Sequence, residues 1–516
     1  MKSRLAWLGE YGHAALVRHG LRGIEKECLR IDSDGRLSRK PHPQALGAAL
    51  THPHITTDYS EALLEFVTPP CATNWETLQF LCDIHCFVAQ NLDDELLWAQ
   101  SMPCVVGPDE DVPIAYYGES NLGRMKTIYR RGLGHRYGRA MQAIAGVHFN
   151  YSLPVGFWAA YQDYEESRQD ESAFISGQYL RMARNYRRNA WALIYLFGAS
   201  PAVCKSFPLR AGHGLEELDP HTWYLPYGTS LRMSDIGYRN KSQARLQISL
   251  NSLAEYVGGL TTAVTSSSPE YERIGVNVDG EYRQLNANML QIENEYYAAV
   301  RPKPKAKSSS RPTVALRRSG VEYLEIRTLD LNVADPVGVN QTQLRFVEAL
   351  LLYCLFTDSP PIGAAEQAEI DQRELLVARE GRKPGLEFSV DGADVPLSRL
   401  GLDLLDGIAP FAALLDAAEE GYVDALEQQR SAIREPELTP SARLLADMTT
   451  RGQSYLDFML EVSRAHGAYF RSLALTEERT SQLGELARVS IEEARALEND
   501  TQESLEAYLA AYLAEV

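Results

Sequence analysis

The sequence contains little cysteine and no hydrophobic run of membrane length. Its seven cysteines are odd in number and widely spaced, and none follows Cys354, so we do not expect a disulfide framework. Residues 1–20 contain no apolar run long enough for a signal peptide. The most apolar later run, FVEALLLYCLF, is about half as long as a membrane span and contains Glu348. These absences predict a cytoplasmic protein without a membrane partner.

Basic residues are fewer than acidic ones, and the common glycine-rich phosphate loops are absent. The chain has 51 Lys and Arg residues against 69 Asp and Glu residues, and its net charge of −18 argues against a nucleic-acid partner. Neither a G-x-x-x-x-G-K-[ST] loop nor a G-x-G-x-x-G motif is present. A nucleotide, if one binds, would therefore be held by metal ions and basic side chains.

The sequence does contain several carboxylates on predicted strands. The stretch GIEKECLRID is typical of a strand that ends in a turn at Asp32. Alternation along a strand places Glu25 and Glu27 on one face, about 7 Å apart. Three more segments, TTDYSEALLEFVTP, GVHFNYSLP and EYLEIRTLD, combine an apolar side with a polar one. If these strands are neighbours, one wet face of the sheet collects Glu25, Glu27, Glu65, His148 and Glu325.

Carboxylates that crowd together need cations, because like charges repel and their burial is costly. Oxygen ligands with a single imidazole suit Mg²⁺ or Mn²⁺ better than zinc. Several carboxylates would hold more than one ion, and clustered divalent ions commonly bind phosphates. The alternative is that each pair is only the solvent face of an amphipathic strand. That alternative is favoured for any one segment alone, and the presence of four such segments shifts the balance toward metal binding.

Two apolar segments are predicted as buried helices. The segment CDIHC places Cys82, His85 and Cys86 on one side of a helix, as in part of a zinc site. No second ligand pair follows, and the surrounding LQFLCDIHCFVAQ is almost wholly apolar, so we favour a core helix. The stretch RNYRRNAWALIYLFGASPAV predicts a second buried helix that ends at Gly198 and Pro201.

Residues 361–516 have mostly helical patterns. Thr439 before Pro440 predicts one helix start, and the capping box SIEE, Ser490 to Glu493, predicts another. By contrast, RPKPKAKSSSRP, residues 301–312, is basic and rich in Pro and Ser, which predicts a mobile, solvated loop. The alternative is a loop that closes over a polyanion such as the phosphates of a nucleotide.

Several long motifs, taken in order, resemble the gamma-proteobacterial type of glutamate–cysteine ligase, also called gamma-glutamylcysteine synthetase. They are GIEKECLRI, THPHITTDYSEALLEFVTP, SMPC, YGESNLGRMKTIYRRGLGHRYG, AIAGVHFNYSLP, LFGASPAVC, YLPYGTSLRMSDIGY, LQIENEYYAAVRPK, GVEYLEIRTLDLN and EGRKPGL. The resemblance extends from about residue 10 to residue 390, and the helical tail resembles the family in character more than in motif.

The resemblance implies a fold and a reaction. The fold is α+β, with a curved, mainly antiparallel sheet of about six strands, as in glutamine synthetase and the guanidino kinases, flanked by helices. We expect residues 1–390 to form the catalytic region, and residues 391–516 to pack on it as a mostly helical part of one compact unit. In the implied reaction, ATP phosphorylates the side-chain carboxylate of glutamate, and the amine of cysteine then displaces phosphate. The product, gamma-glutamylcysteine, begins glutathione biosynthesis.

The resemblance also implies roles for individual residues. Arg327 is expected to neutralise the phosphoryl group in transfer, with Glu325 beside it as a second catalytic residue, and Arg130 is expected at a nucleotide phosphate. The implied ligands of Mg²⁺, or of Mn²⁺ in its place, are Glu25, Glu27, Asp58, Glu65, His148 and Glu325. The implied substrate-binding residues are Tyr59, Tyr129, Leu133, Gln142, Ile144, Asn150, Arg232, Tyr238 and Tyr297.

Tyr238 and Tyr297 resemble a pair that binds the cysteine carboxylate, with Arg232 nearby. The alternative for these residues is a structural role, because the chain has 27 tyrosines and most tyrosines in apolar segments belong to the core or its rim. One departure is visible, because Tyr59 stands where the family resemblance leads us to expect Phe. The added hydroxyl makes strict selectivity for cysteine less certain.

Two rival functions stay open from the sequence alone. One is a different ATP-dependent ligase on the same fold that joins glutamate to another small amine. The other is a catalytically silent relative that binds metal or nucleotide as a regulator, whose expected sign, a lost carboxylate or arginine, is not seen. We expect a monomer whose partners are glutamate, cysteine and ATP.

Overall fold

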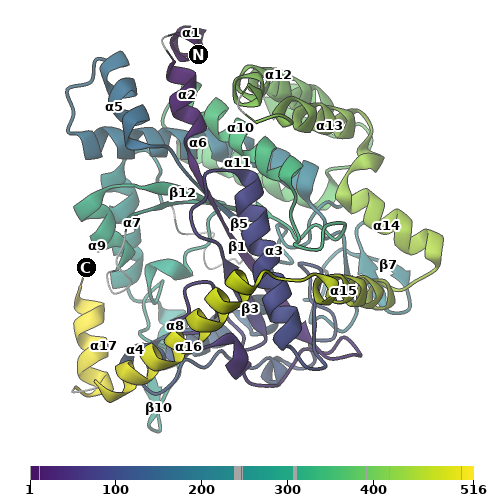
Figure 1. Cartoon of the computed structure of the whole chain (residues 1–516). Helices are drawn as coiled ribbons and strands as arrows, with labels where there is room; N and C mark the ends of the chain where they lie inside the picture. The colour runs from purple at the N-terminus through teal and green to yellow at the C-terminus, as the bar shows by residue number, and fades with distance from the viewer. Residues whose placement is uncertain are drawn as a thin grey trace.

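The computed structural model is α+β, as the sequence predicts, with helices around a central sheet (Figure 1). It describes residues 2–10, 12–237, 246, 248–305, 311–390, 392–417, 419–500 and 503–515. Among these, no helix is both long enough and apolar enough to cross a membrane. The predicted turn after the first strand is present, with the Gly35 N–H donating to the Asp32 carbonyl at 3.2 Å.

The central sheet is an antiparallel path of six strands in the order β11-β12-β5-β1-β3-β2, and a seventh strand, β4, pairs with the end of β1. The path agrees with the expected sheet of about six strands. The strands are β1 (Leu21–Ile31), β2 (Ile55–Thr57), β3 (Leu63–Val67), β4 (Leu96–Leu97), β5 (Val147–Ser152), β11 (Val300–Lys303) and β12 (Tyr323–Leu329).

One face of the sheet forms the core. Ile24, Phe149 and Ile326 lie in register across β1, β5 and β12 and are fully buried. Helix α3 (Asn74–Asn91) packs on β1, and α6 (Glu171–Phe197) packs on β11 and β12. Because side chains alternate along each strand, the opposite face receives the carboxylates.

Local signals in the sequence explain the ends of the major helices. Helix α6 ends at Gly198, as predicted. Helix α10 (Gln341–Phe356) packs on α6 and begins with a capping box between Asn340 and Gln343. The remaining helices before residue 390 are α1 (Lys2–Gly9), α2 (His13–Arg18), α4 (Asn121–Tyr137), α5 (Val155–Tyr164), α7 (Leu253–Thr265), α8 (Pro269–Glu272), α9 (Pro312–Ser319) and α11 (Ala364–Glu380).

The C-terminal region is mostly helical, as expected. Thr439 and Pro440 do begin a helix, but the capping box predicted at Ser490 is wrong, because Ser490 lies inside α16. Its hydroxyl instead accepts a hydrogen bond from the Ala48 N–H at 2.9 Å, which attaches α16 to a distant loop. The helices are α12 (Leu397–Asp416), α13 (Tyr422–Arg434), α14 (Pro440–Arg451), α15 (Tyr455–Ser472), α16 (Glu477–Asn499) and α17 (Leu505–Ala514).

Three small sheets complete the architecture. One has three strands in the order β6 (Ala202–Cys204), β8 (Thr222–Tyr224) and β7 (Glu216–Asp219). The other two are hairpins, formed by β9 (Asn277–Val278) with β10 (Glu281–Tyr282) and by β13 (Glu387–Val390) with β14 (Ala393–Pro396). A disulfide joins Cys104 to Cys204, and the other five cysteines are free. The chain thus has one long-range cross-link rather than a disulfide framework.

The structure differs from the mobile loop that was predicted for residues 301–312. Arg301 and Lys303 belong to the edge strand β11, and Arg311 is buried against Glu293 at 3.1 Å immediately before α9. Only residues 306–310, within the predicted loop, lie outside the described part of the chain. The pairing of β11 with β12 explains the difference, because tertiary contacts outweigh the local preference of Pro and Lys.

Candidate functional site

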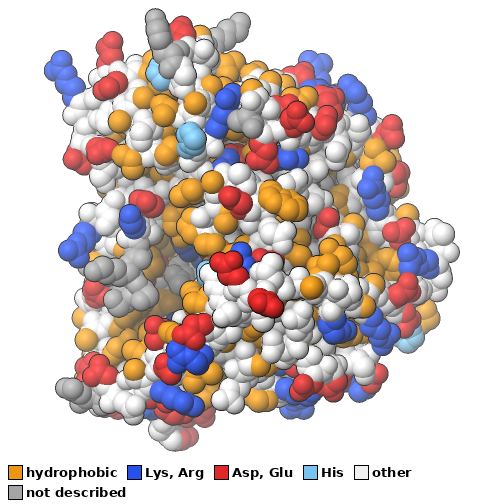
Figure 2. Space-filling view, in the orientation of Figure 1, with side chains coloured by type: hydrophobic (Ala, Val, Ile, Leu, Met, Phe, Trp, Pro, Cys, Tyr) orange, Lys and Arg blue, Asp and Glu red, His pale blue; other side chains and the backbone are white. Residues whose placement is uncertain are grey.

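The site is a row of buried and half-buried carboxylates on the face of the sheet opposite the apolar core. Pairing places Glu25 opposite His148, Glu27 opposite Glu65, and Glu325 opposite Asn150. On the molecular surface, by contrast, acidic and basic side chains are interspersed (Figure 2). Glu27 and Glu325 are 4% and 1% exposed, so these charges are held in place rather than solvated.

Glu25, His148 and Glu325 form one end of the row, which we call the Glu25 end. His148 Nδ1 lies 3.3 Å from a Glu25 oxygen and 3.6 Å from a Glu325 oxygen. One potential ligand atom from each residue can be chosen so that all three lie within 4.8 Å of one another. Burial lowers the pKa of His148 to about 4, so its imidazole is neutral and able to act as a ligand.

Three cations surround the carboxylates of the Glu25 end. Arg327 Nη1 donates to Glu325 Oε1 at 3.0 Å, and Lys303 Nζ lies 3.5 Å from Glu325 Oε2. Arg301 stands opposite Glu325 in the register of β11. Burial alone would raise the pKa of Glu325, but these cations outweigh it and hold the pKa well below its usual range. The Glu325 carboxylate is therefore ionised.

Glu27, Glu65 and Asp58 form the other end, which we call the Glu65 end. The Gly146 N–H donates to Glu27 at 2.7 Å. Burial, reinforced by the nearby Asp58, raises the pKa of Glu27 to about 8. Burial and the neighbouring carboxylates also raise the pKa of Glu65 well above its usual value. Resident cations do not compensate this end as they compensate the other, so an added cation would be favourable here.

Arg130 lies at the Glu65 end. Its Nε donates to the Asp58 carbonyl, and its guanidinium stacks over the Tyr117 ring at 4.5 Å. Lys126, one turn earlier in α4, lies 5.2 Å from the centre of the same ring. The sequence-based prediction named Arg130 but missed Lys126, although the i, i+4 spacing places both on one helix face.

Arg232 is buried and contacts the backbone of β12. Its Nη2 donates to the Arg327 carbonyl at 2.9 Å, and Nη1 lies 3.7 Å from Asp330. A methyl group at Gly146 would lie 2.1 Å from Nη2, so only glycine leaves room for this guanidinium. The structure thus connects Arg232 to the backbone of Arg327.

The described structure brings together only some of the side chains that are predicted to line the amine pocket. Tyr59 is 1% exposed, and its hydroxyl has no hydrogen-bond partner in the described chain. A methyl group at Gly134 would lie 2.5 Å from that hydroxyl, so Tyr59 points at the last turns of α4. Leu133 of α4 and Ile144 are buried.

The other predicted substrate residues lie in different surroundings. The Asn150 amide donates to Glu25 at 3.0 Å, and the Tyr297 hydroxyl lies 3.2 Å from the Met233 sulfur. Burial raises the pKa of Tyr129 above its usual range, and Gln142 is half-buried. Tyr238 lies outside the described residues, so its predicted pairing with Tyr297 stays a prediction.

A cavity of about 530 Å³ opens beside the Glu25 end. Its walls come from β1, β5, β11, β12, α7 and α9, and include Glu25, Asn150, Tyr256, Arg301, Lys303, Lys305 and Tyr323. From the sequence, Arg301, Lys303 and Lys305 were placed in a loop, with closure over a polyanion as the alternative, and the strand β11 that contains the first two was not predicted. The spacing of two between Arg301 and Lys303 was the available signal, because it places both on one face of a strand.

Comparisons with known proteins agree with the resemblance seen in the motifs. The family model described as glutamate–cysteine ligase matches residues 5–377. Proteins named glutamate–cysteine ligase from Azotobacter vinelandii and Pseudomonas aeruginosa are 47% and 46% identical, covering 99% and 100% of this chain and 98% of each relative. A crystal structure of glutamate–cysteine ligase from Francisella tularensis in complex with AMP is 36% identical, with a TM-score of 0.91, covering 96% of this chain and 98% of that chain.

Proposed function

The chain belongs to the glutamate–cysteine ligase family and is a ligase that joins glutamate to cysteine, and from that premise we propose how its residues divide the reaction. The similar solved structure holds a nucleotide, AMP, and this chain uses ATP. A carboxylate is a poor electrophile until one of its oxygens becomes a good leaving group. Phosphorylation of the glutamate γ-carboxylate by ATP supplies that leaving group, and the amine of cysteine then displaces phosphate.

The residues present fit divalent cations. Glu25, His148 and Glu325 offer two carboxylates and a neutral imidazole, a donor set that suits Mg²⁺ or Mn²⁺. At the other end, Glu27, Glu65 and Asp58 supply oxygen ligands whose charge is poorly compensated. When bound, such cations supply charge neutralisation for phosphate oxygens.

Arg327 is the proposed phosphoryl-stabilising residue. Its guanidinium is anchored to Glu325 and lies 3.3 Å from His148, while Arg232 holds its backbone. This support holds the two-pronged N–H donors of the Arg327 guanidinium in place before the reaction. Donors fixed in advance stabilise the charge that develops during phosphoryl transfer.

The 530 Å³ cavity is the proposed nucleotide pocket. Its aromatic and apolar wall, Tyr256, Leu260 and Leu316, offers a surface for a base, whereas Lys303 and Lys305 offer charge for phosphates. The sequence has neither a G-x-x-x-x-G-K-[ST] loop nor a G-x-G-x-x-G motif, so basic side chains are the proposed partners of the phosphates. Arg130, at the far end of the row, is placed to contact a phosphate only if the nucleotide extends along the sheet.

The amine pocket is proposed on the side of α4. Tyr59, Tyr129 and Leu133 converge there, and Gln142 and Ile144 follow α4 in the chain. Tyr297, with Tyr238 and Arg232, is the proposed anchor of the cysteine carboxylate, and Asn150, bonded to Glu25, is proposed beside glutamate. We also propose a cytoplasmic monomer in which residues 391–516 form one unit with the catalytic region of residues 1–390.

The observation that best supports this proposal is the in-register row of carboxylates beside Arg327 and Lys303. The decisive experiment measures ADP release with glutamate, ATP and Mg²⁺, with and without cysteine. We expect release that depends on cysteine and gives gamma-glutamylcysteine. A preference for another amine in a panel that includes glycine and alpha-aminobutyrate would support the rival ligase, and no turnover with any amine would support a silent binding protein.

A further inference from the structure

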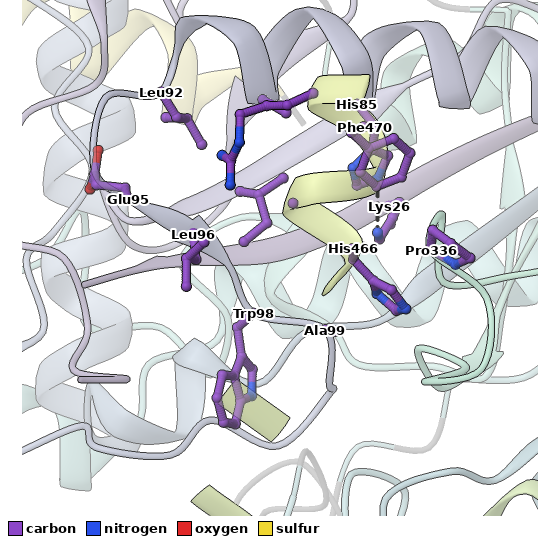
Figure 3. Close-up of a pocket in the computed structure, with 14 residues that line it drawn as sticks. Lys26, His85, Leu92, Glu95, Leu96, Trp98, Ala99, Pro336, His466 and Phe470 are labelled. Carbon is purple, nitrogen blue, oxygen red and sulfur yellow. Dashed lines mark hydrogen bonds between the residues drawn. The ribbon is translucent and has the colours of Figure 1, made fainter. Parts of the chain in front are cut away.

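Lys26 occupies the strand position between the two carboxylates Glu25 and Glu27, but its side chain points to the opposite face of the sheet. There it is 3% exposed, beside His85 of α3 and His466 of α15. Figure 3 shows the Lys26 amine between these two imidazoles, with the His85 ring stacked on Phe470. Nothing in the ligase reaction uses this group.

The Lys26 ammonium has no counter-charge among the described residues. Glu95 lines the same cavity, but both of its oxygens bind Arg30, at 2.9 and 3.0 Å. The nearby Cys28 thiol is neutral, because burial raises its pKa to about 11. Arg471, which also lines the cavity, adds a second positive charge. A buried ammonium without an anion is costly.

Hydrogen-bond donors also outnumber acceptors around this cavity. Lys26 Nζ donates to His85 Nε2 at 2.8 Å. Because an ammonium has no lone pair, Nε2 must accept, and the proton of the neutral His85 ring is on Nδ1. His85 Nδ1 is buried and has no partner in the part of the chain that the structure describes. Two further N–H groups of the ammonium remain. The neutral ring of His466 can accept only one of them, so the side chains around the cavity offer fewer acceptors than donors.

The space beside these donors fits one small particle. The cavity has a volume of about 20 Å³ and is lined by Lys26, His85, Trp98, Pro336, His466 and Phe470. A cavity of about 10–15 Å³ is enough for one water molecule. We propose that a monovalent anion of the size of chloride binds in this cavity against Lys26, on the face of the sheet opposite the catalytic carboxylates. The anion supplies the missing counter-charge and stabilises β1 in its position.

The first test is thermal unfolding in sodium chloride and in sodium gluconate at equal ionic strength, because gluconate is too large for the cavity. Binding to the folded state alone raises the Tm. We expect a saturable increase in chloride, about 1–3 °C beyond gluconate. Lys26→Met should abolish the difference. Lys383→Met, which removes an exposed lysine, is the control and should retain it.

The second test locates the ion and does not depend on any variant folding. Crystals of the full chain soaked in millimolar bromide should show an anomalous peak within hydrogen-bond reach of Lys26 Nζ. A water molecule alone at that position, together with equal Tm values in chloride and gluconate, would overturn the proposal. A bromide peak that appears only at molar concentration, with no effect on the Tm, would overturn it as well.

Discussion

The two ends of the carboxylate row hold the same kind of side chain in opposite electrostatic surroundings. At the Glu25 end, Arg327, Lys303 and Arg301 keep Glu325 ionised against the effect of burial. At the Glu65 end, burial raises the pKa of Glu65, and the neighbouring carboxylates of Glu25, Asp58 and Glu27 add to the effect. Resident cations therefore outweigh burial at Glu325, whereas Arg232 and Arg130 do not outweigh it at Glu27 and Glu65, where an added cation would be favourable.

The difference shows that position on a sheet does not decide the charge of a carboxylate. Glu25 and Glu27 are two residues apart on one strand, yet the pKa of Glu25 is lowered and that of Glu27 is raised. Burial opposes ionisation of both. Cationic and hydrogen-bonding neighbours on β5 and β11 outweigh it for Glu25, whereas at Glu27 it prevails.

The largest expected effect is the loss of activity when either end loses a carboxylate. Glu325→Gln and Glu27→Gln keep the shape of the side chain but remove a charged ligand, so we expect ADP release to fall about 100-fold or more. Initial rates over a range of Mg²⁺ concentrations, with circular dichroism as a test of folding, measure this effect.

Glu387→Gln, at an exposed position of β13, is the matched control and should be fully active. Normal activity of both site variants at ordinary Mg²⁺ concentrations would rule out Glu27 and Glu325 as ligands.

Arg327→Lys tests the Glu25 end alone. Lysine keeps the positive charge but loses the two-pronged donor geometry. We expect kcat to fall about 10–100-fold while the KM for ATP changes less, because the lost interaction belongs to the transition state. Steady-state kinetics separate the two parameters. Arg317→Lys, on the exposed face of α9, should change neither, and a variant at Arg327 altered only in KM would make that residue a simple binding group.

The sharpest test of the comparison is the sign of a stability change in the presence of a chelator. Glu325→Gln deprives three half-buried cations of their main partner, so the Tm should fall by about 4 °C or more. Glu65→Gln removes repulsion from an uncompensated carboxylate, so the Tm should rise by about 1–3 °C. Differential scanning calorimetry with EDTA measures both, and shifts of the same sign would mean that the two ends do not differ.

Much of this row could be predicted from the sequence because it depends on a local rule. Alternation along a strand places Glu25 and Glu27 on one face, and His148 and Asn150 on another such face, whatever the rest of the chain does. From the residues alone, the adjacency of these strands was only a hypothesis. The family resemblance implied it. The register, for example Glu25 opposite His148, needed the structure.

The features that sequence reasoning missed depend on contacts between distant residues. Arg301 and Lys303 were assigned to a loop because Pro and Lys are poor strand formers, but pairing with β12 overrides that preference. Ser490 matched a capping box, yet its partner is Ala48, far away in the sequence. The contact between Lys26 and His85 joins residues 59 apart in the sequence, and alternation along β1 predicts only that Lys26 faces away from Glu25 and Glu27.

The smallest expected effect concerns the proposed amine pocket beside the Glu65 end. A carboxylate anchor is common to all amino acids, so selection of cysteine must come from the fit of its short side chain. One methyl-sized group in such a pocket is worth about 10–200-fold in kcat/KM, so alpha-aminobutyrate should be used less well than cysteine, and glycine poorly.

Tyr59 should modulate that selection through its hydroxyl. The hydroxyl is buried, points at the last turns of α4 and has no partner among the residues that the structure describes, so it is available to a polar substrate atom. Serine offers a stronger hydrogen-bonding group than cysteine. Tyr59→Phe should therefore widen the preference for cysteine over serine by about 3–10-fold while cysteine turnover changes little. The Tm should not fall, because the lost hydroxyl bonds no partner within the described chain. Values of kcat/KM for cysteine and serine, with the exposed Tyr469→Phe as control, measure the change, and an unaltered ratio would show that the hydroxyl does not face the amine substrate.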